Sequence, residues 1–344
     1  MDYNSLLACF KNFITRNRKN IMDYNSLLAC FKSSILLTDK INTFLSNNQQ
    51  KQSVTQSKID KLRIILYRRM AQISLSIYKL LPVSEEEYFS LTSIASLTRV
   101  LIESYKPFYY LTIENIPDEE REFRYSFFEA SLLIERHNML QGIANTSEDP
   151  RLKPELINKK QEIINLPYYK NLTGTTKIPT IYQSVFQSLR DTEMAGPKKT
   201  PGFGIDLMRK LARNGCYKND NDIFLERLEY ELSKTFSDEE EKHLKSRFDK
   251  FFTKLMSNFV HSSAFAISME CDSNFQLDQE VKNYLSQMIS CCIFYLNIAT
   301  YDLINLYQIP LDDALNQELK KAMEGSSVFL SILTGKATSD AGNP

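Results

Sequence analysis

NYLSQMISCCIFYLNIATY, residues 283–301, is the segment from which the architecture of this chain is inferred. Its 19 residues carry no charged side chain, and the segment is long enough for a helix to cross a bilayer. Six polar side chains interrupt it, and each would be costly in lipid: Asn283, Ser286, Gln287, Ser290, Asn297 and Thr300. We therefore expect a helix at about 277–309 that lies at the centre of a bundle, and no membrane partner.

The composition favours a helical globular protein and excludes two broad functions. Lys and Arg number 42, and Asp and Glu also number 42, so the formal net charge is zero. This balance excludes a chain that coats nucleic acid or binds an anionic membrane through its overall charge, although a local basic patch stays open. Only 9 Gly and 11 Pro residues occur, too few for the many tight turns of an all-β fold.

Four long helices form the core of the all-α helical bundle that the sequence predicts. Apolar residues at helical spacing place them at about 84–114, 117–143, 237–270 and 277–309. Capping boxes, Ser84 with Glu87 and Ser237 with Glu240, predict the starts of two of them.

A Pro-rich, irregular insertion at 144–203 separates the second core helix from the third. Six prolines interrupt it, and we expect two short helices, at about 153–165 and 179–190.

The N-terminal region contains an identical repeat. The sequence MDYNSLLACFK occupies residues 1–11 and again residues 22–32. Solenoid repeats diverge and recur more often, so we interpret the pair as a short duplication, with the fold beginning near Met22. The predicted segments are a duplicated, dispensable segment 1–21, an N-terminal helix with a polar linker 22–57, a single helical domain 58–335 and a polar tail 336–344.

The helix expected at about 58–81 is basic. Ser57 is placed to cap its start. Against one acid, Asp60, the helix carries six cations: Lys58, Lys61, Arg63, Arg68, Arg69 and Lys79. Such a helix could contact nucleic acid or an acidic partner, or its cations could form an ordinary solvated face.

Cysteine and histidine usage predicts the compartment. The six cysteines form no C-x-x-C pair and the chain has only 3 histidines, so a zinc site has few ligands to draw on. We expect six reduced thiols in a cytoplasmic protein with no metal and no organic cofactor. The first residues lack the apolar core of a signal peptide, which agrees with this expectation.

The candidate site centres on His261, in the uncharged segment 255–269. Ser257 precedes His261 by four residues and Asn258 precedes it by three, so all three lie near one face of a helix. A buried His surrounded by apolar residues needs hydrogen-bond partners.

Arg99 and Glu103, four residues apart in the helix 84–114, are the partners that we consider for His261. A buried Arg–Glu pair beside a His would shift pKa values, and such clusters gather at functional sites. The alternative is structural: Arg99 and Glu103 form a surface pair, and His261 is a satisfied core residue.

The segment Leu97-Thr-Arg99-Val-Leu-Ile-Glu103, followed far downstream by Ser257-Asn-Phe-Val-His261-Ser, resembles an uncharacterised family of bacterial helical proteins. The resemblance covers about 84–309. It is distantly similar to the HEPN group of helical ribonucleases and defence proteins, which cleave RNA without metal, using an Arg and a His close together on one helix. Here the nearest Arg before His261 is Arg247, fourteen residues earlier, so the Arg would come from another helix.

The resemblance implies an interaction or regulatory module in bacterial stress or phage defence. Its partner would be a protein or RNA, and a homo-oligomer stays open. The alternative that it implies is a metal-independent ribonuclease, in which His261 is the general acid and base while Arg99, beside Glu103, stabilises the phosphorane charge. Ser257 and Asn258 would orient the His or the scissile phosphate.

Overall fold

The computed structural model of the chain describes residues 23–51, 57–84, 87–144, 152–173 and 277–334. These residues form helices and connecting segments without a strand, which confirms the predicted all-α fold. Two predicted helices, 179–190 and 237–270, and the capping box of Ser237 and Glu240 lie outside them. The chain divides into two compact units, one of residues 1–108 and 221–344 and the other of residues 109–220.

The uncharged segment forms the core helix of the first unit, α14 (Gln279–Leu306). Asp278 caps α14, because its carboxylate accepts a hydrogen bond from the backbone N–H of Val281 at 2.8 Å. Every residue from Met288 to Asn297 is buried, as expected for a helix that is largely apolar on all sides. By length and composition α14 could cross a membrane, but most of its apolar stretch is buried inside the described part of the protein.

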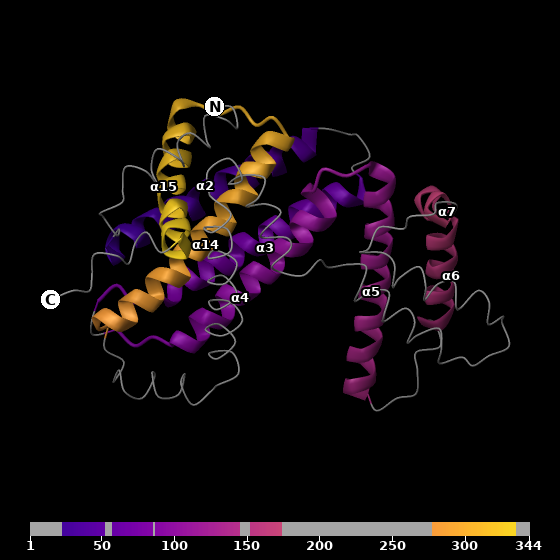
Figure 1. Ribbon diagram of the computed structural model, residues 1–344, viewed down its shortest axis with the longest axis horizontal. Helices are drawn as coiled ribbons and strands as arrows, with labels where there is room; N and C mark the ends of the chain where they lie inside the picture. The colour runs from indigo at the N-terminus through magenta and orange to yellow at the C-terminus, as the bar shows by residue number, and fades with distance from the viewer. Residues whose placement is uncertain (1–22, 52–56, 85–86, 145–151, 174–276, 335–344) are drawn as a thin grey trace. The chain divides into compact units, whose positions relative to one another are not determined.

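Four helices pack around α14 in this unit: α2 (Tyr24–Lys51), α3 (Lys58–Leu80), α4 (Leu91–Phe108) and α15 (Asp313–Thr334) (Figure 1). Gly325 of α15 lies where α15 meets α2 and α14. A Cβ at that position would lie 3.0 Å from the Cβ of Cys30 and 3.1 Å from the Cδ1 of Ile293. A glycine here therefore allows the backbone of α15 to approach both helices closely.

Helix α2 begins in the second copy of the repeat. Its Leu27 and Phe31 are fully buried, and the hydroxyl of Tyr24 donates to the carbonyl oxygen of Pro82 at 2.9 Å. The helix continues to Lys51, so it takes up most of the region 22–57 that was predicted to hold an N-terminal helix and a polar linker. The first copy, residues 1–11, lies outside the described residues.

N-terminal caps were predicted for the helices that the structure shows as α3 and α4. Ser57 caps α3 as predicted, since its side chain accepts from the backbone N–H of Asp60 at 3.1 Å. The predicted capping box of Ser84 and Glu87 is wrong, because α4 begins only at Leu91. The carboxylate of Glu87 instead accepts a hydrogen bond from the backbone N–H of Val83 at 2.8 Å. At the actual start of α4, the Ser90 hydroxyl accepts a hydrogen bond from the backbone N–H of Ser93 at 3.2 Å.

The second unit begins with a π-helical turn, η1 (Tyr109–Ile113), which directly follows α4 in the chain. Pro107 lies in the last turn of α4 and has no N–H to donate, so the regular hydrogen-bond ladder is already interrupted there. The predicted helix 84–114 is therefore α4 followed by a π turn.

Three α-helices complete the described part of the second unit: α5 (Asp118–Ala144), α6 (Leu152–Asn165) and α7 (Pro167–Thr173). The helices α5 and α6 confirm the predictions for 117–143 and 153–165. An aromatic cluster joins α5 to α7: the ring of Phe123 lies 4.8 Å from that of Phe127 and 5.3 Å from that of Tyr168, centroid to centroid.

Candidate functional site

Arg99 and Glu103 form a pair on the exposed side of α4. The Arg99 Nε donates to the Glu103 Oε1 at 2.9 Å, and the two side chains are 37% and 48% exposed. An exposed ion pair one helical turn apart contributes only about 0.3–0.5 kcal/mol to the free energy of unfolding. Arg99 and Glu103 therefore have the geometry of the structural alternative, a surface pair.

His261, Ser257 and Asn258 lie outside the described residues. Whether His261 lies near Arg99 stays a prediction, and so do the roles assigned to Ser257 and Asn258.

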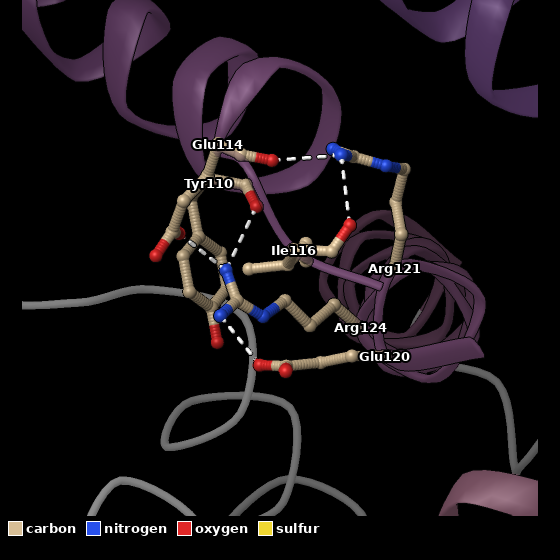
Figure 2. A network of polar contacts seen from close by, with 6 residues as sticks. All are labelled: Tyr110, Glu114, Ile116, Glu120, Arg121 and Arg124. Carbon is tan, nitrogen blue, oxygen red and sulfur yellow. Dashed lines mark hydrogen bonds and ion pairs between the residues drawn. The ribbon is translucent and has the colours of Figure 1, made fainter. Parts of the chain in front are cut away.

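The second unit contains a buried charged cluster that the sequence did not single out (Figure 2). Arg124 of α5, whose side chain is only 3% exposed, forms ion pairs with Glu120 one turn earlier and with Glu114 after η1. Its Nη1 also donates to the carbonyl oxygen of Tyr110 at 3.0 Å, and its Cζ lies 4.0 Å from the centroid of the Tyr110 ring.

Neighbouring groups extend this cluster. The Nη2 of Arg121 donates to the carbonyl oxygen of Glu114 at 2.7 Å. Burial raises the pKa of Tyr168 above its usual range, and the nearby carboxylate of Glu120 raises it further. The phenol of Tyr168 therefore stays neutral.

The cluster is suited to holding η1 against α5 and poorly suited to binding a ligand. Two guanidinium groups, of Arg121 and Arg124, balance the carboxylates of Glu114 and Glu120, so no net charge is left for an ionic ligand. A buried guanidinium that is bound by two carboxylates, a carbonyl and an aromatic ring has its donors occupied by the protein.

A second buried cation in this unit, Lys159 of α6, is also neutralised. It forms ion pairs with Glu129 of α5 and with Glu162 of α6. Burial by itself lowers the pKa of Lys159, but the hydrogen bonds and charges of both carboxylates outweigh burial and raise it. Lys159 is thus a fixed cation that joins α6 to α5.

Polar groups in the core of the first unit join its helices to one another. The hydroxyl of Tyr67 on α3 lies 2.8 Å from the Oγ1 of Thr300 on α14. The Nδ2 of Asn297 on α14 donates to the carbonyl oxygen of Ala322 at 2.7 Å and to the Oγ of Ser326 at 2.9 Å, both on α15. These bonds fix the register of α14 against its neighbours.

The described cysteines are buried thiols without a disulfide: Cys30, Cys291 and Cys292. The other three cysteines lie outside the described residues. Burial raises the pKa of Cys292 to about 12, so its reactive thiolate is scarce at neutral pH.

The six cations of α3 separate into one buried residue and five exposed ones. Arg63 is ion-paired with Asp60, its Nη1 donates to the hydroxyl of Tyr307 at 3.1 Å, and it thereby joins α3 to the end of α14. We call the exposed cations the basic face of α3: Lys58, Lys61, Arg68, Arg69 and Lys79.

Two apolar side chains are exposed on α3 together with the basic face. Ile65 and Leu75 on α3 are 61% and 42% exposed. Arg68 is bound to a neutral group, because its Nη2 donates to the Oγ of Ser46 on α2 at 2.7 Å. Asp60 is the only acidic residue of α3, and its carboxylate is ion-paired with Arg63. The basic face is thus suited to an anionic partner.

Among the described residues, no group of three or more His, Cys, Asp and Glu side chains could hold a metal ion. Comparisons with protein-family models, with curated proteins and with solved structures give no match, so they assign the chain to no family.

Proposed function

We propose that this chain is a cytoplasmic interaction and regulatory module, acting in bacterial stress or phage defence. The observation that supports the proposal most strongly is the contrast between the buried and the exposed cations. Arg63, Arg124 and Lys159 are each neutralised by carboxylates inside the protein. The cations Lys61, Arg68, Arg69 and Lys79 of the basic face have no carboxylate partner among the described residues.

Such a division favours binding. A charge that is exposed and uncompensated attracts a partner of opposite charge and speeds its association, whereas a buried and compensated charge stabilises the fold. Exposed Ile65 and Leu75 on the same helix supply apolar area that a partner can bury.

A metal-independent, HEPN-like ribonuclease that uses His261 and Arg99 is the alternative. Its support in the described residues is the 37% exposure of Arg99, which leaves the guanidinium accessible to a phosphate. This function requires His261 to approach Arg99 from another helix.

A complementation experiment separates the two functions. Cells that lack the chain receive the wild type, His261→Ala, or the charge reversal Arg68→Glu with Lys79→Glu, and growth under stress and phage plaque formation are measured. A matched control, Lys320→Glu with Lys321→Glu, makes the same change of charge at exposed positions of α15.

The interaction module predicts that the reversal on α3 abolishes the phenotype, while His261→Ala and the α15 control retain it. Loss of the phenotype in His261→Ala, with retention in the folded α3 reversal, would overturn the module and favour the ribonuclease.

A further inference from the structure

The exposed side of α3 has the residue spacing of a helix–helix interface. Six exposed residues follow one another at steps of 4, 3, 4, 3 and 4: Lys61, Ile65, Arg68, Gln72, Leu75 and Lys79. We call this set the outward seam of α3. Because steps of three and four keep residues on one side of a helix, the seam is a continuous line about 27 Å long at 1.5 Å per residue.

Alternating steps of three and four are the pattern that a second helix matches. In coiled coils the a and d side chains follow this pattern, and each inserts between residues of the facing helix. The opposite side of α3 packs on the core through residues that are also three or four positions apart: Ile64, Tyr67, Met70, Ser74 and Ile77. The core residues therefore account for the inner pattern. On the outward seam, Arg68 donates to Ser46 of α2, and all six seam residues are nevertheless exposed in the described part of the chain.

The charge of the seam selects an acidic helix. Three of its six residues are cations, at both ends and near the middle, and none is acidic. A partner helix would place Glu or Asp side chains opposite Lys61, Arg68 and Lys79. Leu-like residues would face Ile65 and Leu75, and the polar Gln72 would tolerate a polar partner.

Two other anionic partners fit the seam less well. Single-stranded nucleic acid is commonly bound by aromatic side chains on which bases stack, and the seam contains no aromatic residue. An anionic membrane surface requires a broad apolar face, whereas the seam exposes only Ile65 and Leu75 between its cations.

We infer that the outward seam of α3 binds an acidic amphipathic helix of a partner protein. This inference rests on the proposed function and names the surface and the class of partner that the module uses. Charge complementarity raises the rate at which the complex forms, and burial of the two apolar residues adds to its affinity.

The test uses the full chain and two synthetic helical peptides. One carries Glu-Leu-Glu-Gln-Leu-Glu at the seam spacing, with Ala and Gln elsewhere, and the other carries Lys in place of each Glu. From either end, the seam begins with a cation followed by an apolar residue. The first two and the last two positions of the Glu peptide therefore face complementary seam residues whether the peptide binds parallel or antiparallel to α3. Affinity is measured by isothermal titration at about 50 mM and about 300 mM salt, since screening separates charge from apolar contact.

The Glu peptide should bind at least about tenfold more tightly than the Lys peptide at low salt, a difference that shrinks at high salt. In Arg68→Glu with Lys79→Glu the preference should reverse, and in Lys320→Glu with Lys321→Glu it should persist. Circular dichroism checks that each variant is folded, and the gain of Lys-peptide binding excludes simple loss of structure.

Equal binding of the two peptides, absence of binding, or a preference that survives the α3 reversal would overturn the inference. So would tighter binding to a 20-nucleotide oligouridine or to phosphatidylglycerol vesicles than to the Glu peptide. If these results occur while the α3 reversal still abolishes the cellular phenotype, the inference of an acidic helix as partner is rejected, and the proposal that the chain is an interaction module stands.

Discussion

The Cζ of Arg124 lies 4.0 Å from the centroid of the Tyr110 ring, so the guanidinium is held by a ring as well as by Glu114 and Glu120. Removal of one member of a buried ion pair leaves uncompensated charge, at a cost of about 3–5 kcal/mol. We expect Arg124→Leu to lose about this much in the free energy of unfolding, measured by urea titration.

Arg99→Leu provides the matched control, because Arg99 is also ion-paired with a Glu one helical turn away but lies on the surface. We expect it to change the free energy of unfolding by about 0.5 kcal/mol or less. Similar losses for both variants would contradict the assignment of one pair to the interior and the other to the surface.

Gly325→Ala tests the close approach of α15 to α2 and α14. The new methyl group would meet the Cβ of Cys30 at 3.0 Å and the Cδ1 of Ile293 at 3.1 Å. Overpacking of this kind costs about 1–3 kcal/mol. The Cγ2 of Ile293 also lies 3.1 Å from the new methyl group, and Ile293→Ala removes both of these carbons. The double variant with Ile293→Ala should therefore be more stable than the sum of the single losses predicts, and additive losses would show that the methyl group does not press on Ile293.

Stability should fall at alkaline pH. Burial raises the pKa of Cys292 from 9 to about 12 and raises that of Tyr67 above its usual value. The folded state therefore retains protons that the unfolded state has lost, and the free energy of unfolding falls as pH rises above about 9, by about 1.4 kcal/mol per pH unit for each such group.

Lys159 adds to this fall at still higher pH, because its raised pKa stabilises the folded state only below the pH at which it deprotonates there. The urea midpoint of the wild type and of Cys292→Ala, measured from pH 7 to 11, checks the prediction. The variant should show a shallower decline, and an unchanged slope would exclude Cys292 as a cause.

Deletion of residues 1–21 should change Tm by about 2 °C or less, because the second copy already supplies the buried Leu27 and Phe31. By contrast, Phe31→Ala should cost about 3–5 kcal/mol. A fall in Tm of about 10 °C after the deletion would show that the first copy contributes to the folded core.

Two helices were predictable because their signals are local. The absence of charge over 283–301 indicates burial on all sides, and Ser57 lies directly before the regular pattern of α3. The start of α4 was missed because two serines, Ser84 and Ser90, precede it, and the Glu87 carboxylate accepts from the N–H of Val83 instead of completing the capping box.

The charged clusters could not be told apart from spacing alone. Arg99 with Glu103 and Glu120 with Arg124 each have a one-turn spacing, yet the first pair is exposed and the second is buried. The difference depends on η1, whose π turn places Tyr110 beside Arg124. Pro107 indicates that the regular ladder of α4 is interrupted, but it does not indicate which side chain the turn places beside Arg124.

Site-specific photo-cross-linking in cells tests most directly whether this protein acts by binding through α3. Benzoylphenylalanine replaces Gln72, at the middle of the outward seam, or Lys321, at an exposed position of α15 as control. We predict one protein adduct at position 72, none at position 321, and a cross-linked peptide with Leu and Glu or Asp at alternating steps of three and four. An RNA adduct at position 72, or the same adducts at both positions, would contradict binding of a partner helix through α3.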